Sequence, residues 1–318
     1  MRIRRTLLAL AVGASTLTLS GTAFAADKVK VVASFSILGD MVHEIGGEHV
    51  ELTTLVGPDG DAHVYEPTPS DVRAVGAAKL LVVNGLQFEG WMTRLAETAS
   101  FKGSEVIAST GIAPIPFAAE EEEDHAAEAA GAAPEAAGEH HHVNDPHAWQ
   151  DLSNGAVYAE NIVEGLSAAD PANAAEYRAN ADAFIAEIKA MDAAVKSELA
   201  AIPEAQRRAV TSHDAFGYFA KAYDIDFIAP EGVSTESEAS AADVAKIIDQ
   251  IRREKISAVF VENVSDPRLI DRIASETSAR IGGTLYSDAL SGPDGPASTY
   301  LKMFQNNIDQ IVKALKTS

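Results

Sequence analysis

The 318-residue sequence contains no cysteine. A chain without cysteine forms no disulfide bond, so its stability depends on a hydrophobic core, which a chain of this length can build. It also has no cysteine that could carry a lipid at the start of the mature protein. From this absence we expect a protein that is not lipid-anchored.

Apolar runs long enough to cross a bilayer are also missing from the sequence. The longest candidate extends from Leu7 to about Leu19, whereas a membrane-spanning helix needs roughly 20 apolar residues. Arginines at positions 2, 4 and 5 precede this run, and the small-residue stretch Ala23 to Ala25 follows it. This pattern predicts a secretory signal peptide at residues 1–25, cleaved after Ala25, and a mature protein in the periplasm.

Basic residues are scarce relative to acidic ones. The chain has 25 Lys and Arg against 47 Asp and Glu, a net charge of −22. This balance disfavours nucleic acid and anionic membranes as partners and is compatible with the attraction of cations. An acid-rich surface that only keeps a secreted protein soluble explains most of these charges equally well.

Two sets of alternating apolar runs and helical patterns define the predicted fold. The first set has strands expected near residues 29–33, 50–56, 80–83 and 106–108, and the second near 209–211, 225–228, 256–261 and 283–286. Helical patterns separate the strands, which is typical of βαβ units around a parallel sheet. We therefore predict an α/β protein with two lobes, each a parallel sheet flanked by helices.

One long helical pattern lies between the two sets. Asp170 and Pro171 mark its expected start, because Asp caps free N–H groups and Pro is tolerated in the first turn. Apolar residues at spacings of three and four follow, namely Tyr177, Ala181, Phe184, Ile188, Met191, Val195 and Leu199. We expect a rigid linking helix at residues 170–202, between an N-terminal metal-binding lobe at 26–169 and a C-terminal one at 203–318. A coiled-coil helix is the alternative.

Three histidines and one aspartate lie in loops that turn-forming residues punctuate. His63, His213 and Asp288 each follow a predicted strand, and His147 lies in Asp-Pro-His-Ala-Trp. Ligands of open α/β sheets bind beyond the carboxyl ends of the strands, so these residues are expected in the cleft between the lobes, two from each lobe. Three imidazoles and a carboxylate form a closed tetrahedral shell suited to Zn²⁺. A lone histidine, however, is more often a structural or surface residue.

Three motifs carry a resemblance to one family. Residues 61–71, 145–151 and 212–219 resemble the metal-binding loops of periplasmic substrate-binding proteins of metal-uptake ABC transporters, in particular the zinc-specific, ZnuA-type branch. The resemblance implies that His63, His147, His213 and Asp288 bind one Zn²⁺ in the interlobe cleft. It also implies delivery to an inner-membrane permease, with a periplasmic metallochaperone as a further partner and a monomeric protein.

Manganese-binding relatives resemble this chain but carry a glutamate at the position of His213, and this departure favours zinc. A manganese-binding homologue, a periplasmic zinc buffer and a metallochaperone remain alternatives. A zinc hydrolase is a further one, but a catalytic zinc keeps one position open for water, and four protein ligands leave none. The sequence has no H-E-x-x-H or G-x-S-x-G pattern. We therefore expect a protein that is not an enzyme.

Three carboxylates are candidates to orient the histidine ligands. Glu262 ends a predicted strand, Glu66 lies in the first motif, and Asp214 follows His213. A carboxylate that accepts the second ring N–H of a ligand histidine fixes the ring and raises its basicity. For each of the three, a solvated or structurally paired carboxylate is an equally good interpretation.

An acidic, alanine-rich segment precedes the Asp-Pro-His motif. Its low complexity predicts a flexible loop at residues 118–143. The loop contains four histidines, His125, His140, His141 and His142. We expect them to capture zinc weakly and pass it to the cleft, although a loop that binds zinc only adventitiously would have the same composition.

Overall fold

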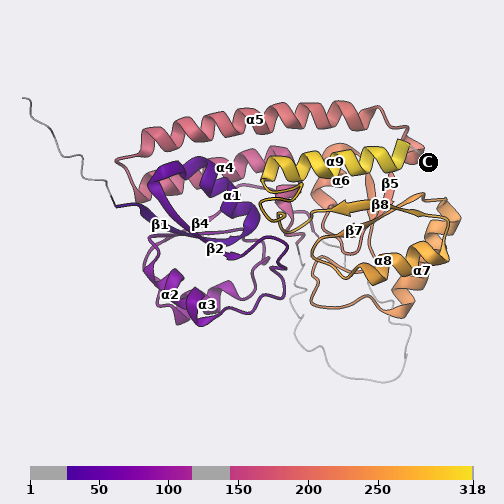
Figure 1. Ribbon diagram of the computed structural model, residues 1–318, viewed down its shortest axis with the longest axis horizontal. Helices are drawn as coiled ribbons and strands as arrows, with labels where there is room; N and C mark the ends of the chain where they lie inside the picture. Colours follow the sequence, from indigo (N-terminus) through magenta and orange to yellow (C-terminus); the bar gives the residue numbers. More distant parts are fainter. Residues whose placement is uncertain (1–26, 117–143, 317–318) are drawn as a thin grey trace, which may run out of the picture.

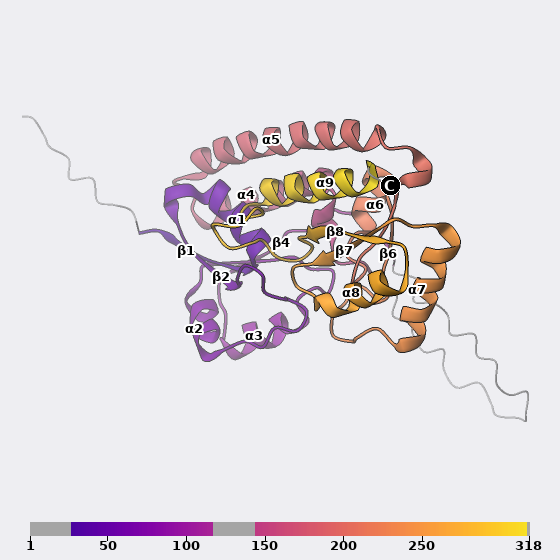
Figure 2. The same ribbon diagram turned by 45° about the vertical axis from the view of Figure 1, so that its right-hand side comes forward.

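The computed structural model describes residues 27–116 and 144–316. The predicted signal peptide and the four histidines of the acidic loop lie outside these residues. Within the described part of the chain, no helix is long and apolar enough to span a membrane. The described residues form two parallel four-stranded sheets that lie side by side, with long helices along one side of both (Figures 1 and 2).

The first sheet has the strand order β2-β1-β3-β4. It is built from β1 (Val29–Phe35), β2 (Val50–Val56), β3 (Leu80–Val83) and β4 (Ser104–Ile107). The 3₁₀ turn η1 (Gly47–His49) and the helices α1 (Ser36–Gly46), α2 (Pro69–Ala77) and α3 (Met92–Thr98) belong to the same lobe. Every residue of β3 is buried, as expected for a central parallel strand covered on both faces.

The second sheet repeats this order as β6-β5-β7-β8. Its strands are β5 (Arg208–Val210), β6 (Asp226–Ile228), β7 (Ala258–Glu262) and β8 (Arg280–Leu285), and η3 (Glu204–Gln206) precedes them. The accompanying helices are α6 (Gly217–Tyr223), α7 (Ala241–Glu254), α8 (Pro267–Glu276) and α9 (Tyr300–Lys316). Two parallel sheets of equal order confirm the predicted α/β class. In each sheet the order reverses beside the first strand, and ligands bind at such switch points.

Between the two sheets the chain forms a pair of helices, α4 (Leu152–Ala169) and α5 (Ala174–Ala200). Asp170 is the C-cap of α4, so α5 begins four residues later than the Asp-Pro pair suggested. The Asp170 carboxylate accepts hydrogen bonds from Asn173 Nδ2 at 2.6 Å and from the Tyr177 hydroxyl at 2.8 Å. These two bonds stabilise the tight turn between α4 and α5.

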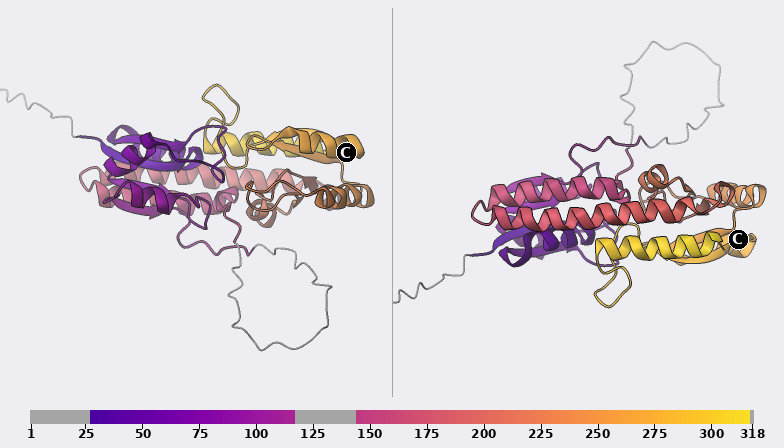
Figure 3. Two further views of the ribbon diagram at one scale, coloured as in Figure 1. Left: turned by 90° about the horizontal axis from the view of Figure 1, so that it is seen from below. Right: turned by 90° about the horizontal axis from the view of Figure 1, so that it is seen from above.

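Helix α5 extends along both sheets and lies next to α4 and α9 (Figure 3). Its 27 residues give a length of about 40 Å at ~1.5 Å per residue. The buried side chains continue along the whole helix, namely Tyr177, Ala181, Phe184, Ile185, Ile188, Val195 and Leu199. Residues near both ends of α5 are packed into the core, so the helix is attached to both lobes.

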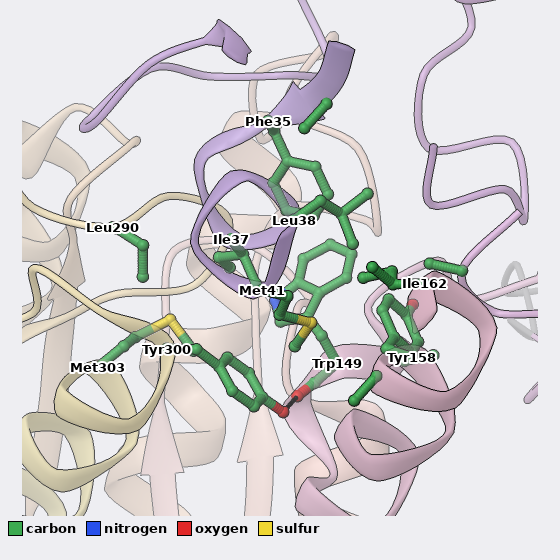
Figure 4. Close-up of a cluster of buried hydrophobic side chains, with 14 of the residues drawn as sticks. Phe35, Ile37, Leu38, Met41, Trp149, Tyr158, Ile162, Leu290, Tyr300 and Met303 are labelled. Atoms are coloured by element: carbon green, nitrogen blue, oxygen red, sulfur yellow. Dashed lines mark hydrogen bonds between the residues drawn. The ribbon is translucent and has the colours of Figure 1, made fainter. Parts of the chain in front are cut away.

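The main hydrophobic core is continuous between the two lobes. Met41 and Trp149 come from the first lobe, and Met303 and Tyr300 come from the C-terminal helix α9; all four are fully buried or nearly so. The Tyr300 hydroxyl donates to the Trp149 carbonyl at 2.6 Å (Figure 4). The segment that follows His147 is therefore in direct contact with the start of α9.

Candidate metal centre

His63 is held by contacts on both sides of its backbone. Its N–H donates to Asp61 Oδ1 at 2.9 Å, and the carbonyl of the preceding Ala62 accepts from Trp91 Nε1 at 2.8 Å. The Phe88 ring lies edge-on to the imidazole, with ring centroids 4.8 Å apart. The loop after β2 therefore presents the His63 ring in a defined orientation, with only 8% of the residue exposed.

His147 is fully buried just before a single 3₁₀ turn, η2 (Ala148–Gln150). Asp145 Oδ1 accepts its backbone N–H at 2.9 Å and lies 2.8 Å from its Nδ1. The carbonyl of Pro146 accepts from Asn84 Nδ2 at 2.9 Å, which fixes the loop to the end of β3. A carboxylate at Nδ1 favours the tautomer that leaves Nε2 free for a metal ion.

His213 follows β5 and is held by Glu262 at the end of β7. Glu262 Oε1 accepts the backbone N–H groups of Ser212 and His213 at 2.7 and 2.9 Å. Its second oxygen, Oε2, lies 2.8 Å from His213 Nδ1. One carboxylate therefore fixes both the backbone and the ring of His213, and Nε2 is left to face the cleft.

Asp288 completes the cluster from the loop after β8. Its carboxylate oxygens lie 3.3 Å from His63 Nε2, 3.5 Å from His147 Nε2 and 3.1 Å from His213 Nε2. The candidate ligand atoms of these four residues all lie within 4.8 Å of one another. The structure thus brings together the four residues that the sequence had singled out, three of them after strands.

Several polar atoms in this cluster have no hydrogen-bond partner. His63 Nε2, His147 Nε2 and Asp288 Oδ1 are all buried and unpaired. Buried polar atoms in native proteins are nearly always paired, so three unpaired ones that converge on one point require an explanation. A divalent cation bound to these atoms provides it, because imidazole nitrogen and carboxylate oxygen are ligands of such ions.

The electrostatics of the cluster also suit a cation. Burial by itself lowers the pKa of His147, but the carboxylates of Asp288 and Asp145 outweigh it and raise that pKa to about 9. Burial likewise lowers the pKa of His213, and Glu262 and Asp288 raise it well above its usual range. Burial raises the pKa of Asp288, yet His147 and His213 hold it well below its usual range. The pocket therefore stabilises positive charge, as protons or as a metal ion.

The other carboxylates predicted to orient ligands differ in position. Glu262 lies against His213, as described above, whereas Glu66 is exposed, and the hydrogen bonds found among the described residues do not connect it to a histidine. Asp214 is partly buried, and burial raises its pKa. Its backbone N–H donates to the Gly232 carbonyl at 3.0 Å.

Sequence reasoning missed Asp145, although an Asp two residues before a ligand histidine was a usable signal.

A model of the ZnuA family, described as the periplasmic zinc-uptake complex component A, matches residues 31–314 of this chain. The iron-binding protein YfeA of Yersinia pestis is 34% identical over 91% of this chain and 86% of that protein. The manganese-binding lipoprotein MntA of Halalkalibacterium halodurans is 32% identical over 93% of this chain and 91% of that protein.

Solved structures of similar proteins agree with this match. The periplasmic zinc-binding protein TroA of Treponema pallidum superimposes with a TM-score of 0.79 and 30% identity, covering 91% of this chain and 99% of that one. A manganese-bound periplasmic metal-binding protein from Candidatus Liberibacter asiaticus has a TM-score of 0.76 and 30% identity, covering 91% and 100% of the two chains. The two-lobe fold is shared with both.

The comparisons overturn the expectation of a protein that is not lipid-anchored. Relatives from Halalkalibacterium halodurans, Streptococcus sanguinis and Streptococcus pyogenes are named lipoproteins. That expectation rested on the absence of cysteine alone. The lipoprotein relatives show that it is wrong.

Proposed function

Because the chain belongs to the ZnuA family of periplasmic zinc-uptake components, we propose that it binds one Zn²⁺ between its lobes and delivers it to the membrane permease of an ABC transporter. In the coarser terms of the family, the protein is a metal-binding, substrate-binding component of such a transporter and not an enzyme. Zinc is the substrate that is carried, so the site has to bind it tightly and also release it.

The observation that carries the proposal is the convergence of His63, His147, His213 and Asp288 within 4.8 Å in a buried pocket. Three imidazoles and one carboxylate match the tetrahedral preference of Zn²⁺. Mn²⁺ favours oxygen ligands and six-fold coordination, which this donor set supplies poorly. Relatives named for iron and manganese share the coarser function, and the donor set supports zinc as the substrate of this chain.

The finer organisation is also part of the proposal. We assign residues 26–169 and 203–318 to the two metal-binding lobes and 170–202 to the link between them. The loop histidines, His125 and His140 to His142, are proposed as weaker zinc-capture residues. A periplasmic metallochaperone is a proposed donor of the ion, and the protein is proposed to act as a monomer.

Chelator competition on metal-free protein tests the proposal. We expect one tightly bound Zn²⁺ per chain, and weaker binding of Mn²⁺ at the same site. His147→Ala removes a fully buried ligand and should weaken zinc binding by several orders of magnitude. His43→Ala, at an exposed position of α1, is the matched control and should leave the affinity unchanged.

Two results would count against the proposal in different ways. Wild-type zinc affinity in His147→Ala would show that the ligand assignment is wrong. If the unaltered protein binds Mn²⁺ more tightly than Zn²⁺, the location of the site is still supported but zinc is not its preferred ion.

A further inference from the structure

The backbone carbonyl of Ser287, immediately before Asp288, accepts two hydrogen bonds from the other lobe. Trp149 Nε1 donates to it at 2.9 Å and Gln150 Nε2 at 2.7 Å. Both donors belong to the 3₁₀ turn that follows His147. The turn that follows one ligand of the cluster therefore also holds the residue that precedes another ligand, and Gln150 and Ser287 are 137 positions apart in the chain.

Two more hydrogen bonds attach the same segment to the first lobe. The Leu290 N–H donates to Ser36 Oγ at 2.9 Å, and its carbonyl accepts the Asp59 N–H at 2.8 Å. From the second lobe, Asn263 Nδ2 reaches the Ala289 carbonyl at a longer 3.3 Å. Tyr286, just before this segment, is held by Asn307 of α9, which accepts its N–H at 2.9 Å and donates to its carbonyl at 2.8 Å. From Ser287 to Leu290, by contrast, the backbone hydrogen bonds are made mainly to the first lobe.

His213 is held in the opposite way. Its partner Glu262 ends β7 of the second sheet, and the Thr211 hydroxyl donates to the His213 carbonyl at 3.1 Å. These contacts stay within the second lobe. The boundary between the lobes thus separates His213 from the other three residues of the cluster, although the chain order places two ligands in each lobe.

We propose that Gln150 is a positioning residue that fixes Asp288 to the first lobe, so that His63, His147 and Asp288 form one rigid three-ligand group and His213 is the ligand that the second lobe supplies. This inference rests on the proposed function. Residues that hold a ligand in place affect metal affinity strongly without touching the ion. Gln150 is 1% exposed, so its amide is a dedicated internal contact and not a surface group.

Gln150 is a cleaner test of this arrangement than Trp149. The Trp149 ring packs against Phe35 and Phe88, with centroids 5.0 and 4.8 Å apart, so its replacement would disturb the core directly. Gln150→Met keeps most of the side-chain volume and removes the amide group that donates to Ser287. The matched control is Gln305→Met, which makes the same change at an exposed position of α9.

The expected result for Gln150→Met is a zinc affinity about 10-fold lower, within the 10- to 100-fold range of such positioning residues. The loss should come from faster zinc dissociation, measured by transfer to a chromophoric chelator. Gln305→Met should match the unaltered protein. Circular dichroism and thermal unfolding of each metal-free variant establish that the fold is intact. Ser36→Ala, which removes the acceptor of the Leu290 N–H, replaces Gln150→Met if that variant does not fold.

A double-mutant cycle separates positioning of Asp288 from a general structural effect. If Gln150 acts through Asp288, Gln150→Met should cause no further loss of affinity in an Asp288→Ala background. In a His213→Ala background the full 10-fold loss should remain. An equal loss in both backgrounds would overturn the proposal. Wild-type zinc affinity in Asp288→Ala alone would instead refute the proposed ligand set.

Discussion

Glu262 Oε2 lies 2.8 Å from Nδ1 of His213, and the other oxygen of the same carboxylate accepts the His213 backbone N–H at 2.9 Å. Both residues are buried, with at most 1% of either exposed. The carboxylate therefore determines the rotation of the ring and the position of its backbone together. A neutral side chain in its place would keep some of the hydrogen bonds but lose the charge that raises the basicity of the ring.

Glu262→Gln should therefore lower zinc affinity by roughly 10- to 100-fold, the range found for carboxylates that contact a ligand histidine. Chelator competition measures the change. Glu238→Gln, at an exposed position of the second lobe, is the control and should have wild-type affinity. Equal affinities for both variants would mean that Glu262 only supports the loop backbone.

Zinc affinity should depend on pH because protons compete for His147. Its pKa is raised to about 9, so below that pH each ion has to displace at least one proton. The apparent affinity should rise at least tenfold per pH unit, and that dependence should weaken above about pH 9. Affinity measured between pH 6 and 9.5 checks this. Asp145→Asn removes one of the carboxylates that raise the pKa of His147. In this variant the pH dependence of zinc affinity should therefore weaken at a lower pH.

The raised pKa of His147 has the opposite effect on the stability of the metal-free protein, which should decrease as the pH rises. The folded-state pKa of His147, about 9, is above the usual value of 6.5. Protonation therefore stabilises the fold fully below pH 6.5, and this contribution is lost as the pH rises through about 9. The measurement is the unfolding free energy of the metal-free protein between pH 6.5 and about 9. If the titration of His147 makes this free energy rise with pH, the raised pKa of His147 is wrong.

The sequence was a good guide where local chemistry determines the outcome. His63, His213 and Asp288 follow strands, and parallel strands bring their carboxyl ends to one edge, so their convergence could be predicted. Glu262 could be predicted for the same reason. Glu66 lies in the same motif as His63 but is exposed, because motif membership does not determine which way a loop side chain points.

Contacts between distant segments could not be predicted in this way. The hydrogen bond from Gln150 to Ser287 joins residues 137 positions apart, and no periodicity encodes such a contact. The turn between α4 and α5 was missed for a related reason. Asp170 is typical of a helix start, but here it ends α4 and accepts a hydrogen bond from the Tyr177 hydroxyl. The packing of α4 against α5, and not the local sequence, determines this position.

His213→Glu should narrow the preference for Zn²⁺ over Mn²⁺. The change replaces an imidazole with a harder oxygen ligand that Mn²⁺ binds better, while it weakens a tetrahedral zinc site. Competition between the two ions for each protein measures the ratio of affinities. His213→Gln is the control, because it removes the imidazole without adding a charge. An unchanged ratio in His213→Glu would mean that the shape of the cleft determines the selectivity.

The length and packing of α5 predict a small change of shape on metal binding. Buried residues from Tyr177 to Leu199 attach this helix to the core along both lobes, so separation of the lobes has to bend it. Small-angle scattering of metal-free and zinc-loaded protein should give nearly equal radii of gyration. Ala190→Pro, at an exposed position in the middle of α5, removes a helical hydrogen bond and kinks the helix at a cost of ~3 kcal/mol, so it should enlarge the difference. Ala174→Pro is the matched control, because proline is tolerated at the first helical position. A large decrease in the radius of gyration of the unaltered protein on zinc binding would show that α5 does not restrain the lobes.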